Sequence, residues 1–213
     1  LAARTFDGVL NRLFLDPIFK ASYPQDLVAA LPGAFPAGAD GDLKTIAAPI
    51  DFLGVNYYSR SVICHDLSAP PLHFSQIYPV GREYSQMWEI YPQGLHEILT
   101  RVWQDYRPAR LWVSENGIPV ADGVDLDGRV RDSRRTAYYR DHLAQVKRAI
   151  DDGVPVDTYL AWSLIDNFEW SYGYQMRFGI VYVDFATQER IIKDSGNWYA
   201  SVIRNNGFQY EFS

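Results

Sequence analysis

The sequence predicts an α/β fold built around a parallel sheet. Helical patterns alternate with short apolar stretches along the whole chain, which is typical of repeated strand–helix units. The apolar stretches contain almost no polar residues, as expected of strands in a sheet whose two faces are both covered. Polar and aromatic residues gather directly after these stretches, at the edge where an α/β barrel builds its active site. We therefore expect a functional site at the carboxyl ends of the strands.

Elements in the first half of the chain follow from the spacing of apolar residues. A helix is predicted from five positions at helical spacing, which are Phe6, Val9, Leu10, Leu13 and Phe14. Pro17 is expected to end this helix, because proline lacks the amide hydrogen that the helix needs. Residues 22–49 are rich in Pro, Gly and Ala and predict a loop with one short helix. Residues 51–57 predict a buried strand, and residues 66–92 a long irregular loop.

Two further helices are predicted over residues 95–106 and 139–150, where apolar residues again recur at helical spacing. Asp132 or Ser133 is expected to cap the second of these helices, and Gly153 to close it. The other predicted elements are a strand at 110–114, an acidic loop at 120–131, a strand at 157–163, a strand pair at 180–193 around Thr187 and Gln188, and a helix at 195–204.

Composition excludes several classes of protein. The 213 residues are 47% hydrophobic and 22% charged, a balance that supports a folded core. The net charge is −6 and no polybasic run occurs, so we expect no nucleic-acid partner. No apolar run approaches the ~20 residues that cross a bilayer, so we expect no membrane partner. A lone cysteine, Cys64, excludes an internal disulfide framework and favours a reducing compartment, which predicts a cytoplasmic location.

The sequence gives no sign of a cofactor. The four histidines have no metal-ligand spacing, and His142 is expected to be solvated on the surface of its helix. No glycine-rich nucleotide loop occurs either. We therefore expect neither a metal nor an organic cofactor.

Three segments could carry chemistry. In VSENG, at 113–117, Glu115 directly follows an apolar strand, where it is either a catalytic carboxylate or an acid that caps a turn. Residues 161–179 interleave six aromatic residues with Asp, Asn, Glu and Arg, which favours a wall for a polyol over a purely structural corner, because buried polar atoms need partners. In DFLGVNYY, at 51–58, Asn56 and Tyr58 end a strand and could contact a ligand, Glu115 or only the surrounding structure.

A glycosidase hypothesis follows from the carboxylates in these segments. Glu115 and Glu169 could form the pair that such enzymes use, with one attacking the anomeric carbon and the other handling the proton. Composition and spacing alone leave open whether these two are the pair.

Taken together, the segments resemble glycoside hydrolase family 1, the β-glucosidase and β-galactosidase family. The resemblance covers nearly the whole chain, and the string from Trp162 to Gly179 is its most specific part. The matching pieces, in family order, are YP near 23, DFLGVNYYSR at 51–60, WEIYPQGL at 88–95, VSENG at 113–117, GVPVDTYLAWSLIDNFEWSYGYQMRFGIVYVDF at 153–185 and TQERIIKDSGNWY at 187–199.

The resemblance implies a (β/α)8 barrel that hydrolyses β-glycosides, most often β-glucosides, with retention. Glu115 matches the family's nucleophile, with Ser114 where many members have Thr, and Tyr58 matches the residue that hydrogen-bonds it. The other matches are substrate ligands, namely Asn56 near the sugar's 2-hydroxyl, Trp162 under the glycone, Glu169 and Trp170 at its distal hydroxyls, and Phe178 in the wall of the same subsite. The Glu-Trp pair implies an unphosphorylated sugar. Glu169 is thereby interpreted as a substrate ligand and not as the acid.

One departure from the family limits what this chain can do by itself. The family's general acid/base lies in an Asn-Glu-Pro motif on the fourth strand, and no Asn in this sequence precedes a Glu. We therefore expect residues 1–213 to be the C-terminal part of one barrel domain, holding strands six to eight with their helices. Three strands cannot close a barrel. The expected partners are thus a β-glycoside or oligosaccharide and the N-terminal half of the barrel, as another chain or segment.

Two alternatives remain open at the level of sequence. A non-catalytic sugar-binding or assembly subunit would keep the aromatic wall and lack turnover. A transglycosidase of the same family would share the intermediate, because water and an acceptor sugar compete for it.

Overall fold

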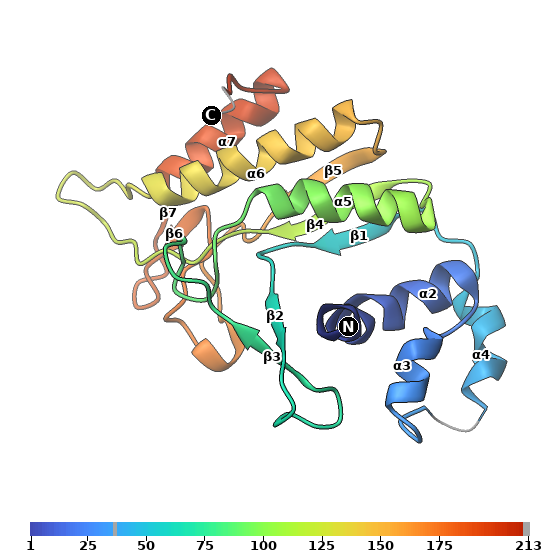
Figure 1. The fold of residues 1–213 in the computed structure, drawn as a ribbon. Helices are drawn as coiled ribbons and strands as arrows, with labels where there is room; N and C mark the ends of the chain where they lie inside the picture. The colour runs from blue at the N-terminus through green and yellow to red at the C-terminus, as the bar shows by residue number, and fades with distance from the viewer. Residues whose placement is uncertain (36–37, 211–213) are drawn as a thin grey trace. The chain divides into compact units, whose positions relative to one another are not determined.

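The computed structural model describes residues 1–35 and 38–210, and its chain divides into two compact units (Figure 1). Unit 1 consists of Leu1–Asp51, Arg60–Gly81 and Gln104–Arg107. Unit 2 consists of Phe52–Ser59, Arg82–Trp103 and Pro108–Ser213. All of the predicted site residues belong to unit 2, so this unit alone positions them.

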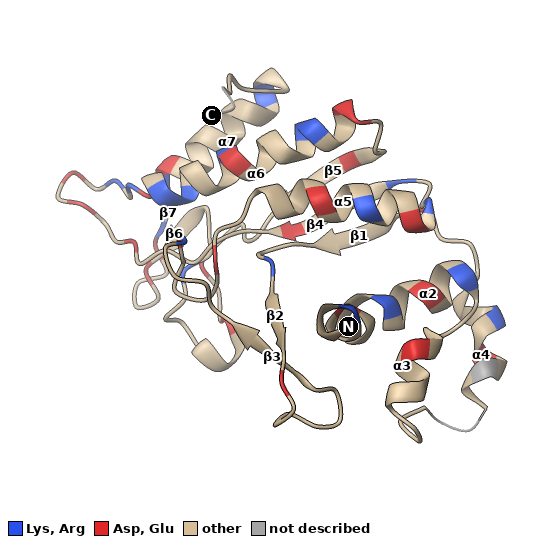
Figure 2. Ribbon diagram, viewed as in Figure 1, with Lys and Arg blue, Asp and Glu red and all other residues tan. Residues whose placement is uncertain are grey.

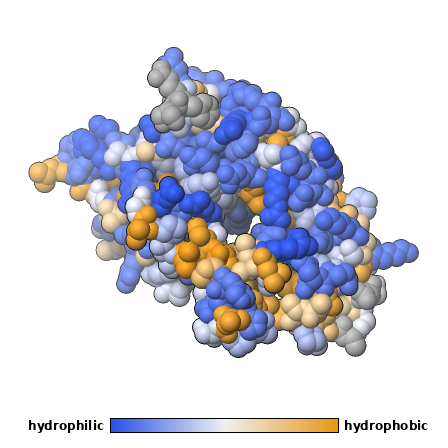
Figure 3. Space-filling model, viewed as in Figure 1, coloured by the Kyte–Doolittle hydropathy of each residue, from blue (hydrophilic) through white to orange (hydrophobic). Residues whose placement is uncertain are grey.

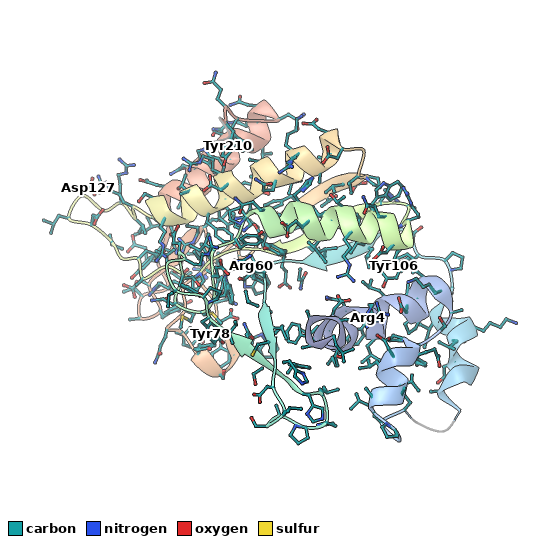
Figure 4. All side chains as sticks on the ribbon, viewed as in Figure 1. Arg4, Arg60, Tyr78, Tyr106, Asp127 and Tyr210 are labelled. Atoms are coloured by element: carbon teal, nitrogen blue, oxygen red, sulfur yellow. The ribbon has the colours of Figure 1, made fainter. Side chains whose placement is uncertain are left out.

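Unit 1 is mainly helical. Its elements are α1 (Ala2–Asp7), the π-turn η1 (Gly8–Arg12), α2 (Leu13–Lys20), α3 (Gln25–Ala30), α4 (Ala39–Ile46) and the antiparallel hairpin of β2 (Val62–His65) and β3 (Phe74–Ile77). Buried Arg12 pairs with Asp26 at 2.9 Å and lowers the pKa of that carboxyl to about 2. Tyr106, labelled in Figure 4, donates a 2.7 Å hydrogen bond to buried Asp16. These contacts fix α2 and α3 within the unit.

Three expectations for unit 1 are wrong. Pro17 lies inside α2, which continues to Lys20, because proline removes only one helical hydrogen bond and its fixed φ is compatible with a helix. Residues 22–49 contain two helices where one was predicted. The expected irregular loop at 66–92 includes β3, whose pairing partner β2 lies before the loop in sequence and gave no local signal.

Unit 2 contains the predicted parallel sheet. Its elements are β1 (Leu53–Asn56), α5 (Gln93–Tyr106, whose last residues belong to unit 1), β4 (Leu111–Asn116), α6 (Ser133–Asp151), β5 (Val156–Ala161), the 3-10 turn η2 (Trp170–Tyr172), the hairpin of β6 (Val181–Val183) and β7 (Arg190–Ile192), and α7 (Asp194–Asn205). The strand order is β1-β4-β5, and every pair in this sheet is parallel. The strand pair at 180–193 and the final helix are likewise confirmed.

Helices cover one face of the sheet. Figure 1 shows α5 and α6 lying along it, and Leu99, Val113 and Ala149, from α5, β4 and α6, are completely buried. The outer surface of α6 and α7 is hydrophilic (Figure 3), and charges of both signs alternate along α5 and α6 (Figure 2). Each helix is thus amphipathic, with its apolar side toward the strands. None of the helices within residues 1–35 and 38–210 is long and apolar enough to span a bilayer.

The other face of the sheet is open, which corrects the prediction of strands buried on both sides. Exposure alternates along β1, where Gly54 and Asn56 are exposed and their neighbours are half-buried. Leu160 on β5 is 47% exposed, and Phe52, stacked on Trp112 with ring centroids 3.8 Å apart, is 40% exposed. Apolar strand residues therefore face a side that unit 2 does not cover.

The start of α6 differs from the predicted cap. Asp132 is the N-cap residue, but its carboxylate makes no capping hydrogen bond and instead binds Arg135 and Ser195. The helix ends as predicted, with Gly153 at φ 85° and its amide bonded to the carbonyl of Ile150.

Candidate active site

Glu115 lies at the carboxyl end of β4, the central strand of the sheet. The parallel register between β1 and β4 shifts just before Asn56, which lies opposite Glu115. The amide of Tyr57 donates to the carbonyl of Glu115 at 2.9 Å, so the two strands remain paired up to this residue. The half-buried carboxylate is therefore presented from a fixed backbone at the open end of the sheet.

Tyr58 is the direct partner of this carboxylate. Its hydroxyl donates to Oε2 of Glu115 over 2.7 Å. The pKa of Tyr58 is raised well above its ordinary value, first by burial and then by this hydrogen bond to Glu115. The phenol therefore stays protonated and remains a hydrogen-bond donor to this carboxylate.

Asn116 fixes the backbone beneath Glu115. It is completely buried, and its side-chain nitrogen donates to the carbonyl of Tyr57 at 2.7 Å and to the hydroxyl of Tyr138 at 3.0 Å. Its side-chain oxygen accepts from the hydroxyl of Tyr159 at 2.6 Å. Asn116 thus ties the residue before Tyr58 to α6 and β5 through neutral hydrogen bonds.

The backbones after β4 and β5 approach closely at Gly117. A Cβ atom at this position would lie 1.8 Å from the carbonyl oxygen of Trp162, so only glycine fits. The amide of Trp162 donates to the carbonyl of Asn116 at 2.8 Å, and the hydroxyl of Tyr139 donates to the carbonyl of Trp162 at 3.0 Å. This packing places half-buried Trp162 beside the end of β4.

Glu169 lies on the loop after β5 and faces the same space as Glu115. Its pKa is raised, chiefly by burial and further by the negative charge of Glu115, while hydrogen bonding to Trp162 and Asn167 opposes the rise. Its Oε2 atom is buried and has no hydrogen-bond partner within the protein. A buried carboxylate oxygen without a donor is costly, and a ligand hydroxyl would satisfy it.

An aromatic wall stands behind Tyr58. Phe178 is 1% exposed, and its ring centroid lies 6.3 Å from that of Tyr58 and 6.0 Å from that of Trp88. The Tyr58 and Trp88 rings are 4.9 Å apart. Trp88 was not among the predicted site residues, although it begins the WEIYPQGL segment at 88–95.

Two of the predicted sugar-binding residues are more exposed to solvent than the others. Trp170 is 80% exposed in η2, and its indole projects from the loop after β5. Asn56 is exposed, and its side-chain oxygen accepts a 2.7 Å hydrogen bond from Ser114. The structure therefore brings Tyr58, Glu115 and Phe178 together, with Glu169 near Trp162 and Glu115.

A buried network of charges underlies the loop of Glu169, and the sequence did not reveal it. Asp166 is 2% exposed and binds Lys193 at 2.8 Å and Arg177 at 2.6 Å. Asp122 binds Lys193 at 2.9 Å and Arg135 at 2.7 Å. Sequence analysis placed the Asp and Arg of residues 161–179 in a wall for a polyol and made no prediction for Asp122, Arg135 or Lys193.

His142 is buried and not solvated as predicted. Its ring stacks on Tyr138 with centroids 3.8 Å apart, and its Nδ1 lies 2.7 Å from the carbonyl of Tyr138. Burial lowers the pKa of His142 to about 3, so the ring is neutral at ordinary pH. Helical spacing put this residue outside because it lies off the apolar stripe of Tyr139, Leu143, Val146 and Ile150, but α6 also buries polar residues such as Arg135 and Gln145.

Across the described residues, which leave out 36–37 and 211–213, no three His, Cys, Asp or Glu side chains are grouped so that they could hold a metal ion. The donors around Glu115 are instead hydroxyl, amide and indole groups, which suit a polyol.

A carboxylate at the end of a parallel strand, a second carboxylate near it and an aromatic wall are features of an α/β protein with a candidate site for a polyol. The family model described as glycosyl hydrolase family 1 matches residues 1–208, and the chain belongs to that family.

Curated relatives agree with this assignment. The chain is 42% identical over 200 residues to β-glucosidase A of Thermotoga maritima, which covers 92% of this chain and 44% of the relative. It is 40% identical to a bifunctional β-D-glucosidase/β-D-fucosidase of Bifidobacterium breve, covering 96% of this chain and 48% of the relative. The chain therefore spans about half the length of these relatives.

Solved structures give the same result. A family 1 β-glucosidase from Thermotoga maritima superposes with a TM-score of 0.94 at 41% identity, covering 98% of this chain and 47% of that chain. A complex of the Thermotoga maritima β-glucosidase with castanospermine superposes with a TM-score of 0.93, with the same coverage. The chain thus has a partial α/β fold that corresponds to about half of a family 1 β-glucosidase.

Proposed function

We propose that this chain is the C-terminal part of a retaining β-glycosidase, most concretely a β-glucosidase that hydrolyses terminal, unphosphorylated β-D-glycosides. The observation that carries the proposal is the hydrogen bond of 2.7 Å from Tyr58 to Glu115 at the end of the central strand. The names of the relatives support the substrate class, since they include β-glucosidases and a β-D-glucosidase/β-D-fucosidase.

In this mechanism Glu115 is the nucleophile. Its carboxylate attacks the anomeric carbon, the bond to the leaving oxygen breaks, and a general acid protonates that oxygen. The same group then takes a proton from water, which attacks the glycosyl-enzyme and releases Glu115. Tyr58 orients the carboxylate of Glu115 through its 2.7 Å hydrogen bond.

The sugar occupies the space between Glu115 and the loop after β5. Trp162 forms the platform under the glycone, and Phe178 closes the wall behind it. Glu169 receives distal hydroxyls on its unpartnered Oε2, where a hydrogen bond to a charged group contributes about 1.5–3 kcal/mol. Trp170 contributes to the same end of the sugar, and Asn56 binds near the 2-hydroxyl. In this arrangement Glu169 recognises the sugar and takes no part in proton transfer.

The acid/base comes from an N-terminal half of the barrel, in which strands one to five would precede the three strands here. Three observations support this. The sequence has no Asn-Glu pair, the open face of the sheet exposes Leu160 and Phe52, and the chain spans 44–48% of the length of the relatives above. Without a general acid the leaving oxygen departs unprotonated. General acid catalysis typically contributes about 10²–10⁴-fold to the rate.

A mechanism-based label tests the proposal. The 213-residue chain, assembled with an N-terminal half from a family relative, should react with a 2-deoxy-2-fluoro-β-glucoside and carry the label on the peptide that contains Glu115. The chain alone should turn over no aryl glucoside and should not remain a compact monomer. Glu189→Gln, a change at an exposed glutamate in the turn between β6 and β7, is the matched control and should label normally.

Two outcomes would contradict the proposal. A label on another residue, with Glu115→Gln still active, would reject Glu115 as the nucleophile. A monomeric and fully active lone chain would reject the need for an N-terminal half. Sugar binding without any turnover by the assembled protein would instead favour a non-catalytic subunit.

A further inference from the structure

The loop that carries the proposed sugar ligands is closed at its base by one carboxylate. Residues 163–166 run beside 178–183, with the amide of Ile180 bonded to the carbonyl of Ser163 and the amide of Asp166 bonded to the carbonyl of Val181. Loop 167–178 leaves the sheet between these two stems. Asp166 is the last residue of the first stem, three positions before Glu169.

The Asp166 side chain joins both stems. Its oxygens accept from the amide of Gly179 on the returning stem at 3.0 Å and from Arg177, near the end of the loop, at 2.6 Å. Gly179 has no room for a side chain, because a Cβ atom there would lie 2.2 Å from the amide nitrogen of Asp166. The base of the loop is therefore a tight junction centred on one negative charge.

Lys193 holds this junction from outside the loop. Its ammonium group is completely buried and binds Asp166 at 2.8 Å and Asp122 at 2.9 Å. Its own amide donates to the carbonyl of Ile180 at 3.0 Å, so backbone and side chain both fix the returning stem. Lys193 is the N-cap residue of α7 and lies at least 15 positions from every proposed sugar ligand.

The network balances its charges. Asp122, Asp132 and Asp166 are matched by Arg135, Lys193 and Arg177, and five of these six side chains are at most 1% exposed. Arg135 also donates to the carbonyl of Arg177 at 2.7 Å, which adds a contact to the last part of the loop. Buried pairs of this kind often contribute little net stability compared with apolar residues. Their hydrogen bonds are directional and fix the positions of the groups they join, although Oδ1 of Asp122 has no hydrogen-bond partner.

We propose that Lys193 is a positioning residue for sugar recognition, which acts through Asp166 to set where loop 167–178 presents Glu169, Trp170 and Phe178. The inference rests on the proposed function for its substrate class. Lys193 touches no sugar in this arrangement. It determines selectivity among glycones, because Glu169 and Trp170 lie on the loop that the Asp166 junction closes.

The test separates positioning from the cost of unpaired charge. Lys193→Met alone leaves a buried carboxylate uncompensated and can fail to fold, so the main variant is the charge-balanced pair Lys193→Met with Asp122→Asn. Lys193→Arg is the conservative variant. The control is the pair Lys147→Met with Asp151→Asn, because these two residues of α6 are exposed, bind each other, and their joint replacement also leaves the formal charge unchanged.

Two readouts are measured in the assembled enzyme. Hydrogen exchange of the Asp166, Glu169 and Val181 amides should speed up at least tenfold in the balanced pair, while amides of residues 111–116 should stay as protected as in the parent. The ratio of kcat/KM for aryl β-glucoside to aryl β-galactoside should change at least fivefold. The control pair Lys147→Met with Asp151→Asn should change neither readout, and Lys193→Arg should keep both closer to the parent than the balanced pair does.

The inference would be overturned if the hydrogen-exchange rates of these three amides were unchanged in the balanced pair. It would also be overturned if exchange accelerated equally across the whole sheet. An unchanged selectivity ratio in an active balanced variant would overturn it as well. If the unsubstituted assembly has no glycosidase activity, the proposed function fails, and the exchange data still decide whether Lys193 holds the loop.

Discussion

The two carboxylates of the site are held in different ways. Glu115 ends a central strand, and the groups beneath it are neutral, with buried Asn116 bonded to two tyrosine hydroxyls and one carbonyl. Glu169 lies eight residues beyond β5, on a loop whose base is fixed by Asp166, Arg177 and Lys193.

This difference matches the demands of two kinds of task. A nucleophile must stay ionised, and neutral hydrogen bonds can fix its backbone without adding charges that shift its ionisation. A sugar ligand far from the regular structure has no strand to hold it, so its loop needs strong, directional contacts, which paired and hydrogen-bonded charges supply. Under the proposed function, the catalytic carboxylate lies on the sheet, and the carboxylate that recognises the sugar lies on a loop held by buried ion pairs.

The largest expected effect is the loss of Glu115. In the assembled enzyme, Glu115→Gln should lower kcat for aryl glucosides by several orders of magnitude, because a covalent nucleophile is removed. Glu169→Gln should lower kcat/KM much less and by unequal factors for glucosides and galactosides, since each lost hydrogen bond is about 1.5–3 kcal/mol.

Steady-state kinetics with both variants checks this contrast between the two carboxylates. The assignment of roles would be reversed if Glu169→Gln abolished the acid limb of the pH profile and azide restored its turnover. Equal losses in the two variants would mean that the strand end and the loop do not divide chemistry and recognition.

An intermediate effect is expected at Asn116. Asn116→Ala removes three buried hydrogen bonds, one to the carbonyl of Tyr57 and two with the hydroxyls of Tyr138 and Tyr159, which at about 1 kcal/mol each should lower the free energy of unfolding by about 3 kcal/mol. Thermal unfolding of the assembled protein measures this. Asn197→Ala, at an exposed position of α7, should stay within about 0.5 kcal/mol. A similar small change at Asn116 would show that neutral hydrogen bonds do not hold the end of β4.

The smallest effect concerns stability against pH. Because the folded pKa of Glu169 is raised, the folded state binds its proton more tightly than the unfolded state does. Stability from this group therefore falls as the pH rises from 4.5 through the raised value, and Glu169→Gln removes that fall. The variant should unfold at a slightly higher temperature than the parent at pH 7 and at the same temperature near pH 4.

Melting curves across this pH range decide the point, with Glu189→Gln as an exposed control that should show no such trend. A variant less stable than the parent at pH 7 would show that the Glu169 carboxylate is satisfied within the protein, and not held for a ligand.

Much of the fold was accessible from the sequence because its signals are local. The strands at 51–57, 110–114 and 157–163 are short apolar runs between amphipathic helices, and they form the predicted parallel sheet. The order of polar residues at their ends also predicted where Tyr58 and Glu115 lie. The sequence missed β3 because its partner β2 lies beyond a loop, and antiparallel pairing depends on contacts that no short window contains.

By itself the sequence determined the family, the parallel sheet and the identity of the residues at the strand ends, because periodicity and short strings express backbone preferences and local chemistry. Only the tertiary structure decided that His142 and Lys193 are buried, that Asn116 joins three elements, and that Asp166 closes the loop of Glu169. Burial of a polar group depends on distant partners, 71 residues apart between Asp122 and Lys193 and 90 residues apart between Asp16 and Tyr106. A charged residue whose partners are that distant has the same local pattern as one that faces water.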